Sequence, residues 1–154
     1  MLTHLEERLG RLIQPNVVEL GNVLKEIVNI DQRITPYVKE PEQNAYGRNV
    51  IYQCEHTEII VIMLPSHCVT SIHDHGDSIG AGLVVKGRLR NCVFKAQTEN
   101  LAIEKAEYQF REGQLCFYSR GMIHQIVNSY SDPLILINAY SPPLQNTKVY
   151  QLDK

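Results

Sequence analysis

The feature that most constrains the fold is a succession of short apolar segments, separated by turn residues, that runs from about residue 46 to the end of the chain. Turn signals interrupt it regularly, among them Lys86-Gly87, Glu112-Gly113 and Ser131-Asp132-Pro133. Many short strands joined by such turns are typical of a β-sandwich or a small β-barrel. We expect strands at residues 48–55, 57–65, 68–75, 80–86, 88–96, 107–111, 114–118, 124–128 and 134–140, with a tail strand near 147–152.

The segment before this succession has a helical pattern. Apolar residues recur at helical spacing from Leu2 to Ile13, and a second helix is expected to begin after Asn16. Glu19 stands three residues after Asn16, which is the spacing of a capping box. From Asp31 onward we expect an irregular loop. We therefore predict that residues 1–45 form helices and a loop that pack on a barrel made by residues 46–154, as one structural domain.

Composition limits the classes of function. The chain has 154 residues and a net charge of −2, without a clustered basic face of the kind that nucleic-acid binding needs. It has no apolar run long enough to cross a membrane, and its first residues do not resemble a secretory signal. None of the four cysteines forms a C-x-x-C pair. We expect a cytoplasmic protein with reduced cysteines, no nucleic-acid or membrane partner and no evident protein partner.

A histidine pair is the first candidate for chemistry. His73 and His75 flank Asp74 in a segment expected to be a strand, where side chains alternate between faces. Both imidazoles should then point the same way, about 6–7 Å apart along the strand, and could converge on one metal ion. The pair alone is a weak signal, because histidines fall at this spacing by chance.

A second motif strengthens the metal hypothesis. Gly113, Gly121, His124 and Asn128 follow one another at the spacing of the second motif of the cupins, and the pair at His73 and His75 resembles their first motif. The resemblance implies a mainly β fold, a single cupin (jelly-roll-like) β-barrel carrying the N-terminal α-helices. It also implies a metal set of His73, His75 and His124. The cupin glutamate is absent, with Ile79 or Gly80 near its place.

The missing carboxylate has a chemical consequence. Three neutral imidazoles leave the charge of a divalent ion uncompensated, which favours a substrate that brings its own anion, such as a thiolate. Three ligands on one side also leave positions for a substrate and dioxygen, as on non-haem iron. Zinc also binds three histidines and stays an alternative, which would indicate hydrolysis or structure instead.

Three further segments sharpen the resemblance. Tyr46-Gly47-Arg48-Asn49, Ile72-His73-Asp74-His75 and Ala139-Tyr140-Ser141-Pro142-Pro143 resemble, in order and spacing, the cysteine dioxygenases of bacterial type. The resemblance implies a thiol dioxygenase that oxidises L-cysteine with O2 to cysteine sulfinic acid. It also implies a mononuclear non-haem Fe(II) held by three histidines as cofactor.

The resemblance assigns roles to three other residues. Arg48 matches the arginine that pairs with the substrate carboxylate, and Tyr46 matches a tyrosine beside it. Tyr140 matches the tyrosine whose hydroxyl faces the iron, and the bond that follows Ser141 is expected to be cis. An arginine fork suits a carboxylate on physical grounds as well. The plainer alternatives are a surface charge or ion pair for Arg48 and core packing for the two tyrosines.

The chain departs from the family at two places near Tyr140. Gly80 stands where animal members have a cysteine cross-linked to the tyrosine, so Tyr140 is expected to be a free phenol. Leu136 and Asn138 stand where the family usually has a serine and a histidine that support Tyr140. This second departure leaves the exact thiol open, so a dioxygenase for another small thiol (3-mercaptopropionate or cysteamine) is an alternative. Two further alternatives are a non-catalytic metal-binding cupin and a zinc or manganese cupin; the missing glutamate, Arg48 and Tyr140 count against the last.

Overall fold

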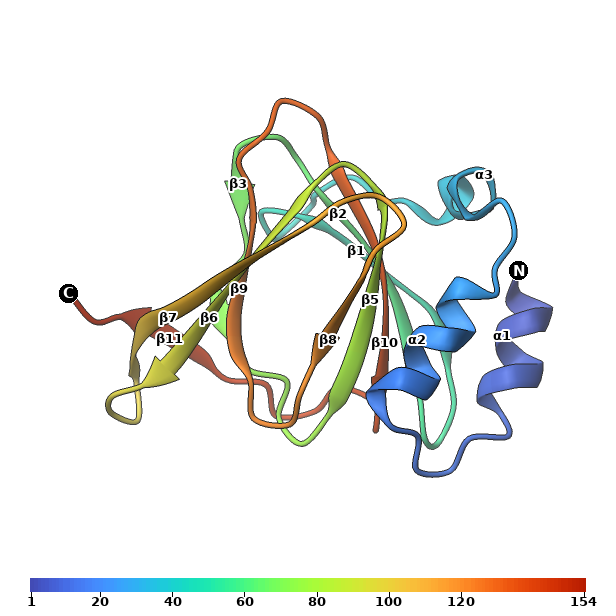
Figure 1. Ribbon diagram of the computed structural model, residues 1–154, viewed down its shortest axis with the longest axis horizontal. Coiled ribbons are helices and arrows are strands. Elements are labelled where there is room, and N and C mark those ends of the chain that lie inside the picture. The colour runs from blue at the N-terminus through green and yellow to red at the C-terminus, as the bar shows by residue number, and fades with distance from the viewer.

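The computed structural model describes residues 1–154 and is mainly β (Figure 1). The helices are α1 (Leu2–Leu9), α2 (Val17–Lys25) and α3 (Ile30–Ile34), followed by the 3-10 turn η1 (Thr35–Tyr37). The strands are β1 (Gly47–Gln53), β2 (Glu58–Leu64), β3 (Cys68–Val69), β4 (Ile72–His73), β5 (Ile79–Lys86), β6 (Leu89–Ala96), β7 (Leu101–Phe110), β8 (Leu115–Tyr118), β9 (Ile123–Asn128), β10 (Leu134–Ser141) and β11 (Val149–Leu152). None of the helices is long and apolar enough to span a membrane.

The strands form two sheets. One has five strands in the order β1-β2-β10-β5-β8, all paired antiparallel. The other has six strands in the order β3-β9-β4-β11-β7-β6, and β6 also pairs with β9, so these pairings close into a ring. Figure 1 shows β5, β8 and β10 on one side of the molecule and β6, β7 and β9 on the other. The predicted mainly β, jelly-roll-like barrel with N-terminal α-helices is confirmed.

Alternating residues give the five-stranded sheet two different faces. On β10, Ile137 and Ala139 belong to a buried cluster shared with the helices, whereas Leu136 and Tyr140 belong to a cluster inside the barrel. We call these clusters the helix-side core and the barrel-side core. Because the side-chain period of a strand is two, this division repeats on every strand of the sheet.

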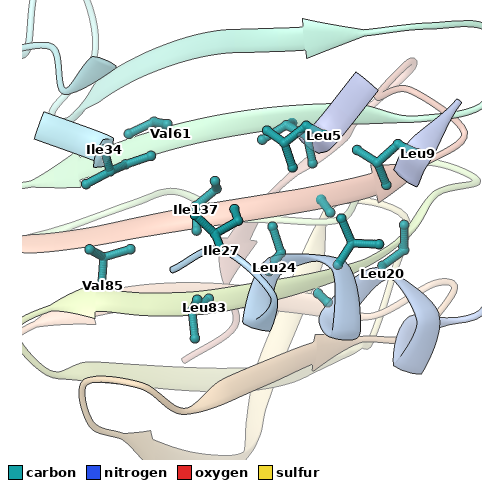
Figure 2. Close-up of a cluster of buried hydrophobic side chains, with 14 residues drawn as sticks. Leu5, Leu9, Leu20, Leu24, Ile27, Ile34, Val61, Leu83, Val85 and Ile137 are labelled. Carbon is teal, nitrogen blue, oxygen red and sulfur yellow. The ribbon is translucent and has the colours of Figure 1, made fainter. Parts of the chain in front are cut away.

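The helix-side core joins the N-terminal segment to the sheet. Figure 2 shows leucines of α1 and α2 directed at the strands that carry Val61, Leu83 and Ile137. Its members are Leu5, Leu9, Leu20, Val23, Leu24, Ile27, Ile34, Ile59, Val61, Ala81, Leu83, Val85, Ile137 and Ala139. The assignment of residues 1–45 and 46–154 to one structural domain stays a prediction, supported by this shared core.

The expected helix start at Asn16 is confirmed. The Asn16 side chain accepts a hydrogen bond from the Glu19 amide at 2.8 Å, and the Glu19 carboxylate accepts one from the Asn16 amide at 3.1 Å. The expectation of an irregular chain from Asp31 onward is wrong for its first part, where α3 and η1 lie. A five-residue helix is too short to show helical periodicity, which explains why the pattern missed it.

The strand expected at 68–75 is divided into β3 and β4. Thr70 lies in the gap, where its amide donates to the Ile126 carbonyl at 3.0 Å and its hydroxyl accepts from the Ile126 amide at 3.0 Å. The hydroxyl thus takes the place of a backbone carbonyl in one of the hydrogen bonds with β9. The expected strand 107–111 is longer than predicted, because β7 begins at Leu101.

Candidate metal centre

Three histidines meet inside the barrel. His73 ends β4 and is directly opposite His124 of β9, while His75 follows two residues later. One ring nitrogen from each of the three lies within 4.8 Å of the other two. The Nε2 atoms of His75 and His124 are 3.1 Å apart.

The expectation that His73 and His75 project from the same strand is wrong, although their side chains do converge. The strand ends at His73, and the chain then turns at Gly76, whose φ is +60°. Asp74 holds this turn, because its Oδ1 accepts hydrogen bonds from the amides of Gly76 at 3.1 Å and Lys148 at 2.9 Å. The Tyr150 hydroxyl donates to the other carboxylate oxygen at 3.2 Å. His75 is therefore positioned by a turn that is anchored to the C-terminal segment.

Hydrogen bonds define the tautomers of two of the imidazoles. The Nδ1 atom of His73 lies 2.8 Å from the Ser71 carbonyl oxygen, and that of His124 lies 2.7 Å from the Asn91 side-chain oxygen. A carbonyl oxygen only accepts, so each Nδ1 carries a proton and donates it. In the neutral ring, Nε2 then has a free lone pair directed at the site.

Burial keeps the three rings neutral. His75 and His124 are 3% and 1% exposed. Desolvation, together with the nearby His73, lowers the pKa of His75 to about 3. Desolvation also lowers the pKa of His124 well below its ordinary value, and that of His73 in the same direction. Neutral imidazoles are the form that binds metals.

This donor set fits a divalent metal ion. The 3.1 Å between the two Nε2 atoms suits two nitrogens bound to one ion at about 2.1 Å each. The Nδ1 atom of His75 is buried without a hydrogen-bond partner, so no protein acceptor fixes the tautomer of this ring, whose Nε2 contacts that of His124. No carboxylate takes part in the cluster. Three neutral donors on one side leave the remaining positions of an ion for other ligands.

Two tyrosine rings cover the histidines. The Tyr140 ring centroid lies 5.0 Å from that of His75, and the Tyr118 centroid lies 5.2 Å from His75 and 5.0 Å from His124. The two phenols stack at 6.0 Å with an interplanar angle of 19°. The Tyr118 hydroxyl donates to the Asn138 Oδ1 at 3.1 Å, and the Asn138 Nδ2 donates to the Tyr140 oxygen at 3.1 Å.

Arg48 and Tyr46 lie at the edge of the same inner face. Arg48 on β1 is directly opposite Ile62 of β2, which packs against the barrel-side core and is itself opposite Leu136. Directly opposite residues share a face, so Arg48 is on the inner face, with its side chain exposed. Tyr46 packs against the barrel-side core that contains Tyr140. Both residues line a hollow of about 150 Å³ beside the loop that contains Glu40.

The positive charge of Arg48 acts on the pKa of Tyr140. Burial is the largest influence on the pKa of Tyr140 and raises it, whereas the hydrogen bond from Asn138 and the positive charge of Arg48 lower it. The structure thus brings the three histidines and Tyr140 into one cluster. Arg48 lies on the edge strand of the sheet and Tyr46 just before it, and the hollow that they line includes neither the histidines nor Tyr140.

The structure also accounts for the two departures from the family pattern. A Cβ atom at Gly80 would lie 2.8 Å from the Tyr140 ring, so this position does adjoin the phenol, and no sulfur is present there. All four cysteines are free. Leu136 is buried in the barrel-side core, and Asn138 is hydrogen-bonded to Tyr140. The predicted cis bond between Ser141 and Pro142 is present.

Sequence reasoning missed two residues of the site, Tyr118 and Asn91. Tyr118 is fully buried on β8 and reaches the cluster because it is opposite Gly80 of β5. Asn91 on β6 bonds His124 and also donates to the sulfur of Cys116 at 3.4 Å. Neither belongs to a recognisable local motif. Only the alternation of β8 offered a signal, since it places Cys116 and Tyr118 on one face.

Comparison with solved structures identifies the barrel type. A conserved protein with a double-stranded β-helix domain from Klebsiella pneumoniae has a TM-score of 0.63 at 16% identity, covering 82% of this chain and 97% of that one. A cupin domain from Schizosaccharomyces pombe has a TM-score of 0.56 at 13% identity, with 69% of each chain covered. An oxalate decarboxylase from Bacillus subtilis has a TM-score of 0.59 at 12% identity, covering 72% of this chain and 29% of that one. These likenesses show a cupin fold.

Comparison of sequences identifies the family. Cysteine dioxygenase type 1 of Rattus norvegicus is 26% identical over 140 residues, which cover 88% of this chain and 70% of the rat protein. The enzyme of Homo sapiens is 25% identical over 114 residues, which cover 71% of this chain and 57% of the human protein. The sequence profile described as "Cysteine dioxygenase type I" matches residues 5–153. The chain therefore belongs to the cysteine dioxygenase type I family.

Proposed function

We propose that the protein is a cysteine dioxygenase, which oxidises L-cysteine with O2 to cysteine sulfinic acid at a mononuclear Fe(II) held by His73, His75 and His124. The observation that carries the proposal is the convergence of three neutral imidazole nitrogens beside a buried phenol, in a chain of this family. Bound there, Fe(II) would supply the redox chemistry of dioxygen and acidify the substrate thiol. The four free cysteines suit a reducing cytoplasm, which we propose as the location.

In this proposal Arg48 binds the carboxylate of cysteine. Its guanidinium offers a planar fork of donors that does not titrate, and its strand neighbour Ile62 faces the barrel-side core. Tyr46 lines the same hollow as Arg48 and packs against the barrel-side core, so in this proposal it limits the space that the substrate can occupy. The carboxylate thereby orients the thiol toward the three histidines.

Tyr140 contacts the reacting atoms in this proposal. Its oxygen accepts a hydrogen bond from Asn138, so its own proton is available to donate toward the histidine cluster. Burial raises its pKa, which keeps the phenol protonated at neutral pH. A donor that is positioned before the reaction stabilises charge that develops on oxygen without reorganisation of solvent.

The direct test is anaerobic reconstitution with Fe(II), followed by cysteine and O2, with the sulfinate formed counted against the O2 consumed. One sulfinate per O2 supports the proposal, because both oxygen atoms then reach sulfur. Stoichiometric iron binding with no sulfinate from cysteine would contradict it and would direct attention to other thiols.

The role of Arg48 has its own test. In Arg48→Gln, we expect the KM for cysteine to rise by about 10- to 100-fold, since a hydrogen bond between charged groups is worth about 1.5–3 kcal/mol. Cysteamine lacks the carboxylate and serves as the matched control, because its KM should be the same for both enzymes. An unchanged KM for cysteine would remove Arg48 from the substrate site.

One observation favours a second candidate, a dioxygenase for another small thiol. Leu136 is fully buried on the inner face, where it offers no hydrogen bond. The surroundings of Tyr140 therefore differ from those of relatives that carry a serine there. A panel of cysteine, 3-mercaptopropionate and cysteamine, compared by kcat/KM on the same iron-loaded protein, separates the two candidates.

A further inference from the structure

Tyr118, Asn138 and Tyr140 form a directed chain of hydrogen bonds. The Tyr118 hydroxyl donates to the amide oxygen of Asn138 at 3.1 Å, and the amide nitrogen donates to the Tyr140 oxygen at 3.1 Å. An amide has distinct ends, one that only accepts and one that only donates. The orientation of the Asn138 amide therefore decides whether Tyr140 accepts from it or must donate to it.

The three groups are shielded from bulk solvent. Tyr118, Asn138 and Tyr140 are 0%, 2% and 4% exposed. A tyrosine hydroxyl carries one proton at neutral pH, because its ordinary pKa is about 10. The two phenols have one proton each, and a single amide lies between them. In the orientation seen here the Tyr118 proton is donated to Asn138, and the Tyr140 proton is not needed for either hydrogen bond.

Strand β5, which pairs with both β8 and β10, leaves the space that this arrangement needs. A Cβ atom at Gly82 would lie 2.4 Å from both the Asn138 Oδ1 and the Tyr118 hydroxyl. One at Gly80 would lie 2.8 Å from the Tyr140 ring and 2.9 Å from the Tyr118 ring. Two successive inner positions of β5 are therefore glycine where the two phenols and the amide occupy the space that a side chain would need.

We propose that Tyr118 is a positioning residue for Tyr140: by donating to Asn138 it holds the amide so that Asn138 donates to Tyr140, and the Tyr140 proton stays directed at the histidine cluster. This inference rests on the proposed function for its kinetic consequence, but its structural content does not. Asn138 cannot titrate near neutrality, so it orients Tyr140 and does not relay a proton.

The main test is Tyr118→Phe, which removes the hydroxyl and keeps the ring that stacks on Tyr140. Tyr108→Phe, on the exposed side of β7, is the matched control. In ¹⁵N-labelled metal-free protein, the side-chain amide protons of Asn138, assigned by their loss in Asn138→Leu, should exchange slowly in wild type and in Tyr108→Phe. In Tyr118→Phe they should exchange faster and shift, because the amide loses the donor that orients it.

The kinetic arm uses the iron-loaded enzyme. In Tyr118→Phe we expect kcat for cysteine to fall by about 10-fold, the scale of lost outer-shell hydrogen bonds, with KM and iron content unchanged. Asn138→Asp tests the direction of the chain separately. A carboxylate only accepts, so it would draw in the Tyr140 proton and lower kcat although both phenols remain.

The outcomes separate the inference from the proposed function. Unchanged amide exchange in Tyr118→Phe, or full kcat in Asn138→Asp, would overturn the inference even if wild type oxidises cysteine. Altered amide exchange in Tyr118→Phe, with no thiol oxidation by wild type, would overturn the proposed function and uphold the positioning by Tyr118.

Discussion

The two faces of the five-stranded sheet carry different kinds of interaction, although they alternate residue by residue along the same strands. On β10, Ile137 and Asn138 are consecutive and are 0% and 2% exposed. Ile137 packs in the helix-side core, where contacts have no direction, whereas Asn138 holds two hydrogen bonds that do. Burial alone therefore does not distinguish a residue that stabilises the sheet from one that positions the chemistry.

This comparison predicts how substitutions on the two faces differ. A change on the helix side should lower the free energy of unfolding and leave the folded site intact. A change on the barrel side should alter metal binding or turnover with little relation to its effect on stability.

The largest effect is expected from His124→Ala on the barrel side. It removes one of three converging nitrogens and leaves the Asn91 oxygen without its donor. We expect iron bound per chain, measured after anaerobic reconstitution and desalting, to fall below detection, and turnover with it. His56→Ala, at a side chain that is 37% exposed, should bind a full equivalent of iron. Full iron content in His124→Ala would show that the metal lies elsewhere.

On the helix side, Ile137→Ala should cost stability without changing the site. Truncation of a fully buried isoleucine lowers the free energy of unfolding by about 2–5 kcal/mol. Urea denaturation measures this change, and Val18→Ala, at a residue that is 54% exposed, should change it by less than about 0.5 kcal/mol. The turnover per bound iron should match wild type. A proportional loss of turnover would contradict the separation of the two faces.

Low pH should lower the free energy of unfolding of the metal-free protein, because three histidines lie largely buried on the barrel side. Burial lowers the pKa of all three histidines in the folded state, and that of His75 to about 3. The unfolded chain, with histidine pKa values of about 6.5, therefore binds more protons, so stability is lost as pH falls below about 6.5. Thermal melting between pH 7 and pH 5 measures the loss. A melting temperature that is the same at both ends would contradict it.

The smallest effect is expected far from the site, at the start of α2. Asn16→Ala removes one side of the capping box and should lower the free energy of unfolding by about 1 kcal/mol. Gln14→Ala, at an exposed neighbour just before the helix, is the control and should have no measurable effect. Iron content and kcat should be unchanged in both. A fall in kcat for Asn16→Ala would mean that the helix side communicates with the metal centre.

Much of the fold could be predicted because the residues that form its turns are recognisable from the local sequence. Gly87 and Gly113 have φ values of +87° and +84°, a backbone region that favours glycine, and each marks a place where two predicted strands separate. The helix start at Asn16 is equally local. By contrast, α3 is too short to show a helical pattern, and the break between β3 and β4 depends on a tertiary contact, that of Thr70 with Ile126.

The residues of the site also fall into two groups, those that local spacing reveals and those that it does not. The histidines could be recognised because their spacing belongs to a known motif. Tyr118 and Asn91 could not, since Tyr118 reaches Gly80 only through the pairing of β5 with β8, and Asn91 reaches His124 through the pairing of β6 with β9. Registers between distant strands decide such neighbours, and no local spacing encodes them. The roles assigned to Arg48, Tyr46 and Tyr140 stay predictions.

The glycine at position 80 has an evolutionary consequence. A side chain there would lie 2.8 Å from the Tyr140 ring and 2.9 Å from the Tyr118 ring, so residues 80 and 118 compete for one volume. A lineage that acquires a larger residue at position 80 must shrink or shift residue 118, and one that acquires the second tyrosine must keep glycine. Among related sequences, the two positions should therefore covary, and tyrosine at 118 should accompany glycine at 80.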